Sequence, residues 1–174
     1  MTQPILATLP SAATRAIDPE AILTRLFARI GRYAGQGVDP EGRAFRAELD
    51  IEALLGRGLQ ARFRARRQET GEVFHEEALM FARDGLGGLC LWVLTGEATG
   101  VERLELVAAT GSEFSPTEMA LQFAVGLPED RTSYRAAMRM VVRARGALEL
   151  VWSCGLPGGD FAERSGLRLR PIAS

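Results

Sequence analysis

The sequence predicts an all-β protein: an antiparallel up-and-down β-barrel of about 8–10 strands, preceded by one short N-terminal helix. Segments in which apolar and polar residues alternate recur roughly every ten to fifteen residues along most of the chain. The turns between them carry Gly, Asp or Pro, and one segment near the start has helical spacing. A meander of neighbouring hairpins closes more naturally as a barrel, and a two-layer sandwich is the alternative.

Length and composition predict one globular domain. The chain has 174 residues, of which 47% are hydrophobic and 25% are charged, as is ordinary for a globular protein. We expect residues 1–17 to form a flexible tail and residues 18–174 to form a single β-barrel domain. The net charge of −1 gives no general attraction to nucleic acid or to an anionic membrane, so neither is an expected partner. All 21 basic residues are arginines, which excludes lysine chemistry such as a Schiff base or a P-loop.

The two cysteines form no disulfide framework, and a chain of this length folds without one. Cys90 lies between two leucines and is expected to be a buried small hydrophobic residue, whereas Cys154 borders a Gly/Pro loop and could be exposed. Residues 1–9 carry neither a basic segment nor a long apolar run, so they do not look like a secretory signal. No apolar stretch reaches the ~20 residues of a membrane span, and we expect a soluble cytoplasmic protein.

The predicted helix begins at residues 18–20, which read Asp-Pro-Glu. Asp can cap the helix, Pro fits its first position, and Glu interacts favourably with the positive end of the helix dipole. Ile22, Leu26 and Ile30 follow at helical spacing, and Gly31 ends the run after roughly three turns.

Residues 43–53 and 58–66 form the clearest pair of predicted strands. In both, the odd positions are apolar (from residue 45 on in the first segment) and most even positions are charged, so each strand has one buried and one solvated face. Residues 55–58, Leu-Gly-Arg-Gly, join them as a hairpin, and matching of the faces requires an odd-length loop or a bulge. One such register places Glu52 opposite Arg62. The arginine-rich face is therefore interpreted as solvated and matched to an acidic neighbour, and not as a phosphate site.

Seven further strands are predicted from shorter apolar runs bounded by turn residues. They are expected near residues 72–82, 88–94, 101–109, 119–125, 133–142, 147–153 and 161–170.

The inventory of chemical groups excludes several classes of site. His75 is the one histidine, so a metal site with two histidines is excluded, and no G-x-S-x-G segment supports a serine hydrolase. We expect no metal. The glycine-rich residues 31–37 follow a helix and lead into a strand, which is the wrong order for dinucleotide binding. Glycine there favours a first strand that bends and closes against the helix.

His75 and Glu77 are the candidate site residues that remain. They lie two positions apart on a predicted strand, so they share a face with Leu79 and Phe81. The opposite face of the strand is nearly as apolar, so the sequence does not decide which of the two faces points into the barrel. If the His75 face points inward, two polar groups lie in an apolar barrel, where they must be paired. They then form either a structural pair or an anchor for a ligand.

Three short motifs carry a resemblance to a known family. Residues 31–37 match the pattern G-x-W-x-G-x-G, with Tyr33 in place of the Trp. Residues 71–81 match G-x-x-(M)-H-x-E-x-x-x-F at its Gly, His, Glu and Phe, and residues 99–102 are similar to T-G-x-x-E. In these segments, and in order over most of residues 20–155, the sequence resembles the nitrobindin-like β-barrels within the broader lipocalin-like class.

The resemblance implies a fold similar to that of fatty-acid-binding proteins, with about ten antiparallel strands and a short helix. Characterised members of the family bind haem b through a histidine near the C-terminus, react with nitric oxide and isomerise peroxynitrite to nitrate. Here the chain after Ser153 contains no histidine, and His75 aligns with a pocket-side histidine instead. The resemblance therefore implies the fold and a cavity with no expected cofactor, although Cys154 could offer a thiolate to a haem.

We therefore expect a lipocalin-like barrel that binds a small, largely apolar ligand and catalyses no reaction. His75 and Glu77 would hold the polar end of the ligand. The candidate wall residues are the four Tyr and Trp side chains, Tyr33, Trp92, Tyr134 and Trp152. One alternative is a haem protein that acts on nitric oxide or peroxynitrite. Another is a barrel filled by its own side chains, which works as an interaction module or as a homodimer.

Overall fold

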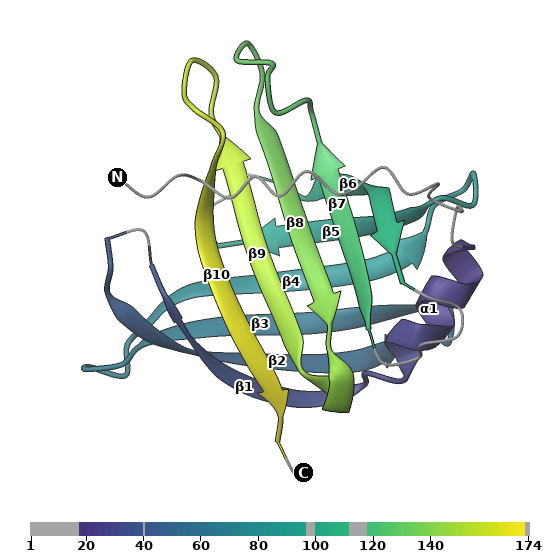
Figure 1. Cartoon of the computed structure of the whole chain (residues 1–174), viewed down its shortest axis with the longest axis horizontal. Helices are drawn as coiled ribbons and strands as arrows, with labels where there is room; N and C mark the ends of the chain where they lie inside the picture. Colours follow the sequence, from purple (N-terminus) through teal and green to yellow (C-terminus); the bar gives the residue numbers. More distant parts are fainter. Residues whose placement is uncertain (1–17, 40, 97–99, 112–117, 173–174) are drawn as a thin grey trace.

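The computed structural model describes residues 18–39, 41–96, 100–111 and 118–172. The predicted tail, residues 1–17, lies outside the described residues. The described chain folds into a closed barrel of ten antiparallel strands with one α-helix (Figure 1), which confirms the predicted fold class. In these ranges, no helix has the length and apolar character needed to cross a membrane.

Each strand pairs with the next one along the chain, and β1 pairs with β10 to close the barrel. The elements in chain order are α1 (Pro19–Phe27), β1 (Gly31–Val38), β2 (Ala44–Leu54), β3 (Gly58–Arg67), β4 (Val73–Arg83), β5 (Leu89–Thr95), β6 (Glu102–Thr110), β7 (Met119–Val125), β8 (Arg135–Val142), the 3₁₀ turn η1 (Ala144–Gly146), β9 (Leu148–Gly155) and β10 (Ala162–Pro171).

Helix α1 begins where the sequence predicts and ends earlier. The side chain of Asp18 caps it by accepting a hydrogen bond from the backbone N–H of Glu20 at 3.2 Å. The helix ends at Phe27, so Ile30 lies outside it and is 47% exposed. The chain must turn at this point to enter β1, and Gly31 takes a φ of 143° that side chains rarely adopt.

The seam between β1 and β10 depends on a glycine. Gly35 lies opposite Leu169, and a Cβ added at Gly35 would lie 2.0 Å from the carbonyl oxygen of Arg168. No side chain fits there, so the two backbones approach closely enough to complete the ladder of hydrogen bonds. The glycine-rich segment therefore serves the closure of the barrel.

The β2–β3 hairpin has the odd-length loop that the sequence predicts, but its register differs by two residues. Leu55 and Gly56 both take positive φ, 51° and 65°, so the chain reverses within a loop of three residues. This tight turn places Glu52 opposite Gln60 and not opposite Arg62. The inward and outward faces are unchanged, because a shift of two residues preserves them.

The outer, arginine-rich face of β3 is matched in part to acidic residues on its neighbours. Arg62 lies opposite Asp50 on β2, and the Asp50 carboxylate accepts a hydrogen bond from Nε of Arg32 on β1 at 3.0 Å. On the other side, Nε of Arg64 donates to Oε1 of Glu76 on β4 at 2.6 Å. These ion pairs neutralise part of a solvated surface. Arg66 differs from the expectation, because the shifted register places it opposite Arg46 and not opposite an acidic residue.

Side chains fill the end of the barrel next to α1. The helix packs against β3 and β4, and Nη1 of Arg83 pairs with Oε2 of Glu20 at 3.1 Å. The rings of Phe81 and Phe123 meet edge to face, with their centroids 5.7 Å apart. The largest fully buried aliphatic residues are Ile22, Leu49, Leu59, Leu91, Leu104, Leu121, Leu148 and Leu169.

Arg135, at the start of β8, is fully buried and ties two loops together. Its Nη1 donates to the backbone carbonyls of Asp130 at 2.6 Å and of Ser133 at 3.1 Å, in the loop before β8. Its Nη2 donates at 2.9 Å to the carbonyl of Gly159, in the loop between β9 and β10. Gly155 leaves the space for this guanidinium, because an added Cβ would lie 2.2 Å from Nη2.

The first prediction tests the two faces of β2. We expect Leu49→Ala, at a side chain that is 1% exposed, to lower the free energy of unfolding by about 2–5 kcal/mol. We expect Asp50→Ala, one residue away on the solvated face, to cost less than about 1 kcal/mol. Urea denaturation of both variants measures the difference, and equal losses would contradict the assignment of the faces.

The second prediction concerns Arg135. Arg135→Met keeps most of the buried volume but leaves several loop carbonyls without a donor, so we expect it to cost about 3 kcal/mol or more. Arg139 lies on the same strand and is exposed, and we expect Arg139→Met to change stability by less than about 0.5 kcal/mol. Urea denaturation provides the measurement. A similar small effect at both positions would show that the carbonyls find other partners.

Candidate functional site

The end of the barrel away from α1 is hollow. A cavity of about 480 Å³ lies between the starts of β4, β8 and β10 and the ends of β3 and β9. Its wall is mainly apolar and includes Phe45, Phe63, Phe74, Met138, Leu150 and Trp152. The volume falls within the usual range of small-molecule sites, roughly 300–1,000 Å³.

Small side chains on inward positions leave this space open. Ala65 is buried on the inner face of β3 and lines the cavity. Around it the aromatic side chains hold one another in place: Phe45 and Phe74 meet edge to face at 5.7 Å between centroids. Phe63 and His75 meet in the same manner at 6.1 Å. The wall is therefore ordered by its own contacts before any ligand enters.

His75 and Glu77 point into the barrel, which settles the orientation that the sequence leaves open. Both line the cavity, and Nε2 of His75 lies 2.9 Å from Oε1 of Glu77. The side chain of His75 is 24% exposed and that of Glu77 is 13% exposed. Further inward on the same face, Leu79 and Phe81 are buried. The pair therefore stands at the boundary between the cavity and the apolar core.

A second polar pair lies in the same cavity. The hydroxyl of Tyr134, just before β8, donates to Oε2 of Glu102 on β6 at 3.0 Å. Burial raises the pKa of Tyr134 well above 10, and the charge of Glu102 with its hydrogen bond raises the pKa further. Cys154 and Glu77 act in the same direction, so both carboxylates lie close enough to influence this hydroxyl.

The six predicted site residues do not all meet. Four of them, His75, Glu77, Tyr134 and Trp152, line the same cavity. Tyr33 is buried elsewhere, where its hydroxyl donates to the backbone carbonyl of Arg29 at 2.8 Å, next to α1. Trp92 lies on the outer face of β5 opposite Met80, because its neighbours Leu91 and Val93 take the inward positions.

The sequence did not place Glu102 or Cys154 among the candidate site residues, although both line the cavity. Glu102 begins a strand whose alternation is weak, so its inward carboxylate looks like an ordinary solvated charge. Cys154 is half-buried in the cavity wall, whereas its position next to a Gly/Pro loop favours exposure. Cys90 is buried, as predicted. In the described part of the chain, no group of three or more His, Cys, Asp or Glu side chains could hold a metal ion.

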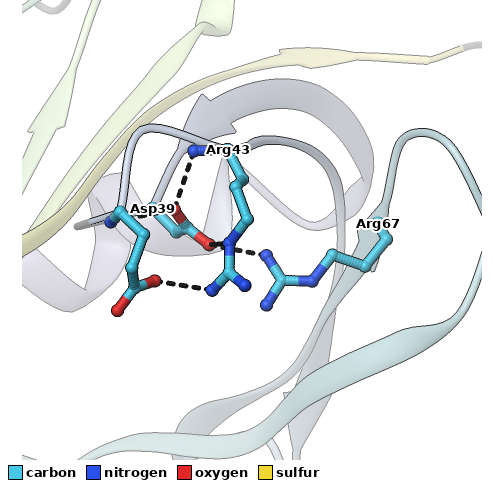
Figure 2. A network of polar contacts seen from close by, with 4 residues as sticks. Asp39, Arg43 and Arg67 are labelled. Atoms are coloured by element: carbon cyan, nitrogen blue, oxygen red, sulfur yellow. Dashed lines mark hydrogen bonds and ion pairs between the residues drawn. The ribbon is translucent and has the colours of Figure 1, made fainter.

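An ion-pair network centred on Asp39 borders the cavity and forms part of its rim. Figure 2 shows dashed lines from the carboxylate of Asp39, after β1, to the guanidinium groups of Arg43 and Arg67. Its Oδ2 accepts from Nε of Arg43 at 2.8 Å and from Nη1 of Arg67 at 2.5 Å. Desolvation raises the pKa of Asp39, but hydrogen bonds from Arg67 and Arg43 outweigh it and hold the pKa well below 3.8. The guanidinium of Arg67 also stacks over Phe74 in the cavity wall, 3.9 Å from the ring centroid.

A second hollow, of about 530 Å³, lies on the outer surface of β2 to β5. Trp92, Met80 and Leu94 form its apolar part, and Asp50 and Arg62 form part of its polar edge. This hollow is separated from the cavity by the sheet itself, because inward and outward side chains alternate along each strand.

One of three comparisons with known proteins, the one with solved structures, found a similar protein. No family model and no curated protein matches the sequence. Among solved structures, the protein is similar to "Rv2717c from M. tuberculosis", with a TM-score of 0.67 and 15% sequence identity over 87% of this chain and 97% of that chain. At this identity the likeness concerns the fold alone. It supports the β-barrel fold, and the nitrobindin-like assignment stays a prediction.

The third prediction tests the Tyr134–Glu102 pair. In a Tyr33→Phe background, we expect Tyr134 to ionise well above pH 10. We expect Glu102→Gln to lower its pKa while burial keeps it above 10. Folding stability falls as pH rises past 10, because the unfolded chain then releases a proton that the folded chain retains. Ultraviolet titration of tyrosinate gives the pKa. An unchanged pKa in Glu102→Gln would contradict the pair.

Proposed function

We propose that the protein binds a small, largely apolar ligand inside the barrel. The cavity of about 480 Å³ carries this proposal, because it joins a mainly apolar wall to a few convergent polar groups. The aromatic and aliphatic side chains would surround the body of the ligand. The polar pairs His75–Glu77 and Tyr134–Glu102 would hold its polar end.

The energetics favour occupation of such a cavity. Side chains that line an open apolar space lack partner atoms on one side, and a ligand restores those dispersion contacts. A ligand present at about 100 times its dissociation constant adds ~2.7 kcal/mol to the stability of the folded state. Binding should therefore appear as a higher melting temperature.

The interaction-module alternative receives less support from the geometry. A barrel filled by its own side chains would leave little volume at the end where Trp152 and Phe63 line the cavity. The outer hollow around Trp92 is the feature that this alternative would use. Ligand binding in the cavity and in the outer hollow therefore has to be tested with separate variants.

A haem fits the described lining poorly. The candidate iron ligands in the cavity are His75, Tyr134 and Cys154. Nε2 of His75 is engaged by Glu77, and the hydroxyl of Tyr134 donates to Glu102. The two carboxylates would also face the negative propionates of a haem. Cys154 is the one observation that favours this alternative, because its place in the cavity wall brings a thiol to the site.

The fourth prediction uses a neutral apolar dye, N-phenyl-1-naphthylamine, whose fluorescence rises in apolar surroundings. We expect the dye to saturate at one equivalent and to raise the melting temperature. Ala65→Phe would fill the cavity from its inner wall and reduce dye affinity at least about tenfold, with Ala65→Leu as a milder second variant. Ala78→Phe, at an exposed position on the outer face of β4, is the matched control and should have little effect.

The opposite pattern would contradict the proposal. Loss of dye binding in Ala78→Phe but not in Ala65→Phe would place the dye in the outer hollow. If neither the dye nor a broad panel of apolar ligands changes the melting temperature, the binding proposal fails and the interaction module takes its place.

The fifth prediction concerns haem. Added haemin should bind weakly or non-specifically, because its candidate ligands are engaged or lie beside carboxylates. Absorbance titration in the Soret region measures this binding. A sharp band that saturates at one equivalent and disappears in His75→Ala or in Cys154→Ser would overturn the prediction and favour the haem alternative.

A further inference from the structure

We propose that the polar end of the ligand carries a positive charge, as in an apolar molecule with a protonated amine. This inference rests on the proposed function and specifies the class of ligand. It is carried by two carboxylates, Glu77 on β4 and Glu102 on β6, that face the same apolar cavity from either side of β5. A ligand carboxylate would have to enter beside both of them.

The charges of the described lining favour a cation. The imidazole of His75 is the one basic group bonded to either carboxylate, through Glu77. Arg67 at the rim is engaged by Asp39. Arg164, which also lines the cavity, is exposed at the start of β10, where solvent and salt screen its charge. The interior of the site is therefore more negative than its rim.

Hydrogen-bonding capacity points the same way. Oε1 of Glu77 contacts His75 and Oε2 of Glu102 accepts from Tyr134, while the remaining oxygen of each carboxylate accepts no hydrogen bond from another described residue. An ammonium group has three donors and no acceptor, so it could bond to both remaining oxygens. A carboxylate has acceptors alone and would add a third negative charge.

The aromatic wall adds a further preference for a cation. Trp152 and Phe63 line the cavity together with Tyr134. The face of an aromatic ring attracts a cation, and the attraction increases where the cation loses contact with water. An ammonium held by the carboxylates would therefore lie in surroundings that favour its charge from several sides.

Three probes with one skeleton test the inference: 2-(1-naphthyl)ethylamine, 2-(1-naphthyl)ethanol and 1-naphthaleneacetate, each in competition with N-phenyl-1-naphthylamine. We expect the amine to bind at least about tenfold more tightly than the acid, with the alcohol between them. Glu77→Gln and Glu102→Gln should each weaken amine binding at least about threefold, strengthen acid binding and leave alcohol binding nearly unchanged. Glu105→Gln, on the outer face of β6, removes one charge outside the cavity and is the control.

The outcomes separate this inference from the proposed function. If the alcohol and the dye bind but the acid binds as tightly as the amine, the preference for a cation is wrong and the binding site stands. An equal effect of Glu105→Gln and Glu77→Gln would attribute the preference to overall charge and would also overturn it. If neither the dye nor any of the three probes binds, the proposed function fails and this inference fails with it. Circular dichroism confirms that each variant is folded.

Discussion

The hydrogen-bonded seam between β1 and β10 turns a ten-stranded sheet into a barrel with an interior. It depends on the close approach of two backbones at Gly35, where any side chain would meet the carbonyl of Arg168. Closure removes both exposed sheet edges and gives every strand an inner face. Helix α1 packs at one end of the barrel, and there the interior is filled. The other end keeps its volume, and the cavity is a consequence of closure with one short helix.

The fold could be predicted from the sequence because period-two alternation and turn residues act locally. Alternation in residues 43–53 and 58–66 determines which side chains face inward, and a shift of two residues preserves that choice. The register itself depends on backbone angles at Leu55 and Gly56, which the residue types do not specify uniquely. The end of the helix is harder to predict. Ile30 continues the helical spacing, but the helix stops at Phe27 because the chain has to turn there to enter β1.

The site could be predicted in part. His75 and Glu77 share a face by spacing alone, but both faces of β4 are nearly equally apolar, so the inward face is chosen by pairing with β3 and β5. Trp92 is a second example. A large aromatic residue is expected to face inward, but the alternation of side chains along β5 places Trp92 on the outer face. Glu102 lies in one of the family-like motifs and Cys154 is a possible thiolate, but no local pattern places either of them in the cavity. Their meeting there requires strands that are distant in sequence.

The two polar pairs at the hollow end of the barrel are better explained by ligand recognition than by the stability of the fold. Removing a carboxylate from water costs free energy, and an ion pair offsets this cost only when its geometry is good. Apolar residues in the same positions would often stabilise the fold as well or better. The filled end of the barrel is packed with apolar residues in this way, and Phe81 and Phe123 meet there edge to face. At the hollow end, Glu77 and Glu102 face open volume with oxygens that accept no hydrogen bond from another described residue. Unused acceptors beside an apolar wall suit a partner that brings donors, and this partner would satisfy the carboxylates and fill the space at once.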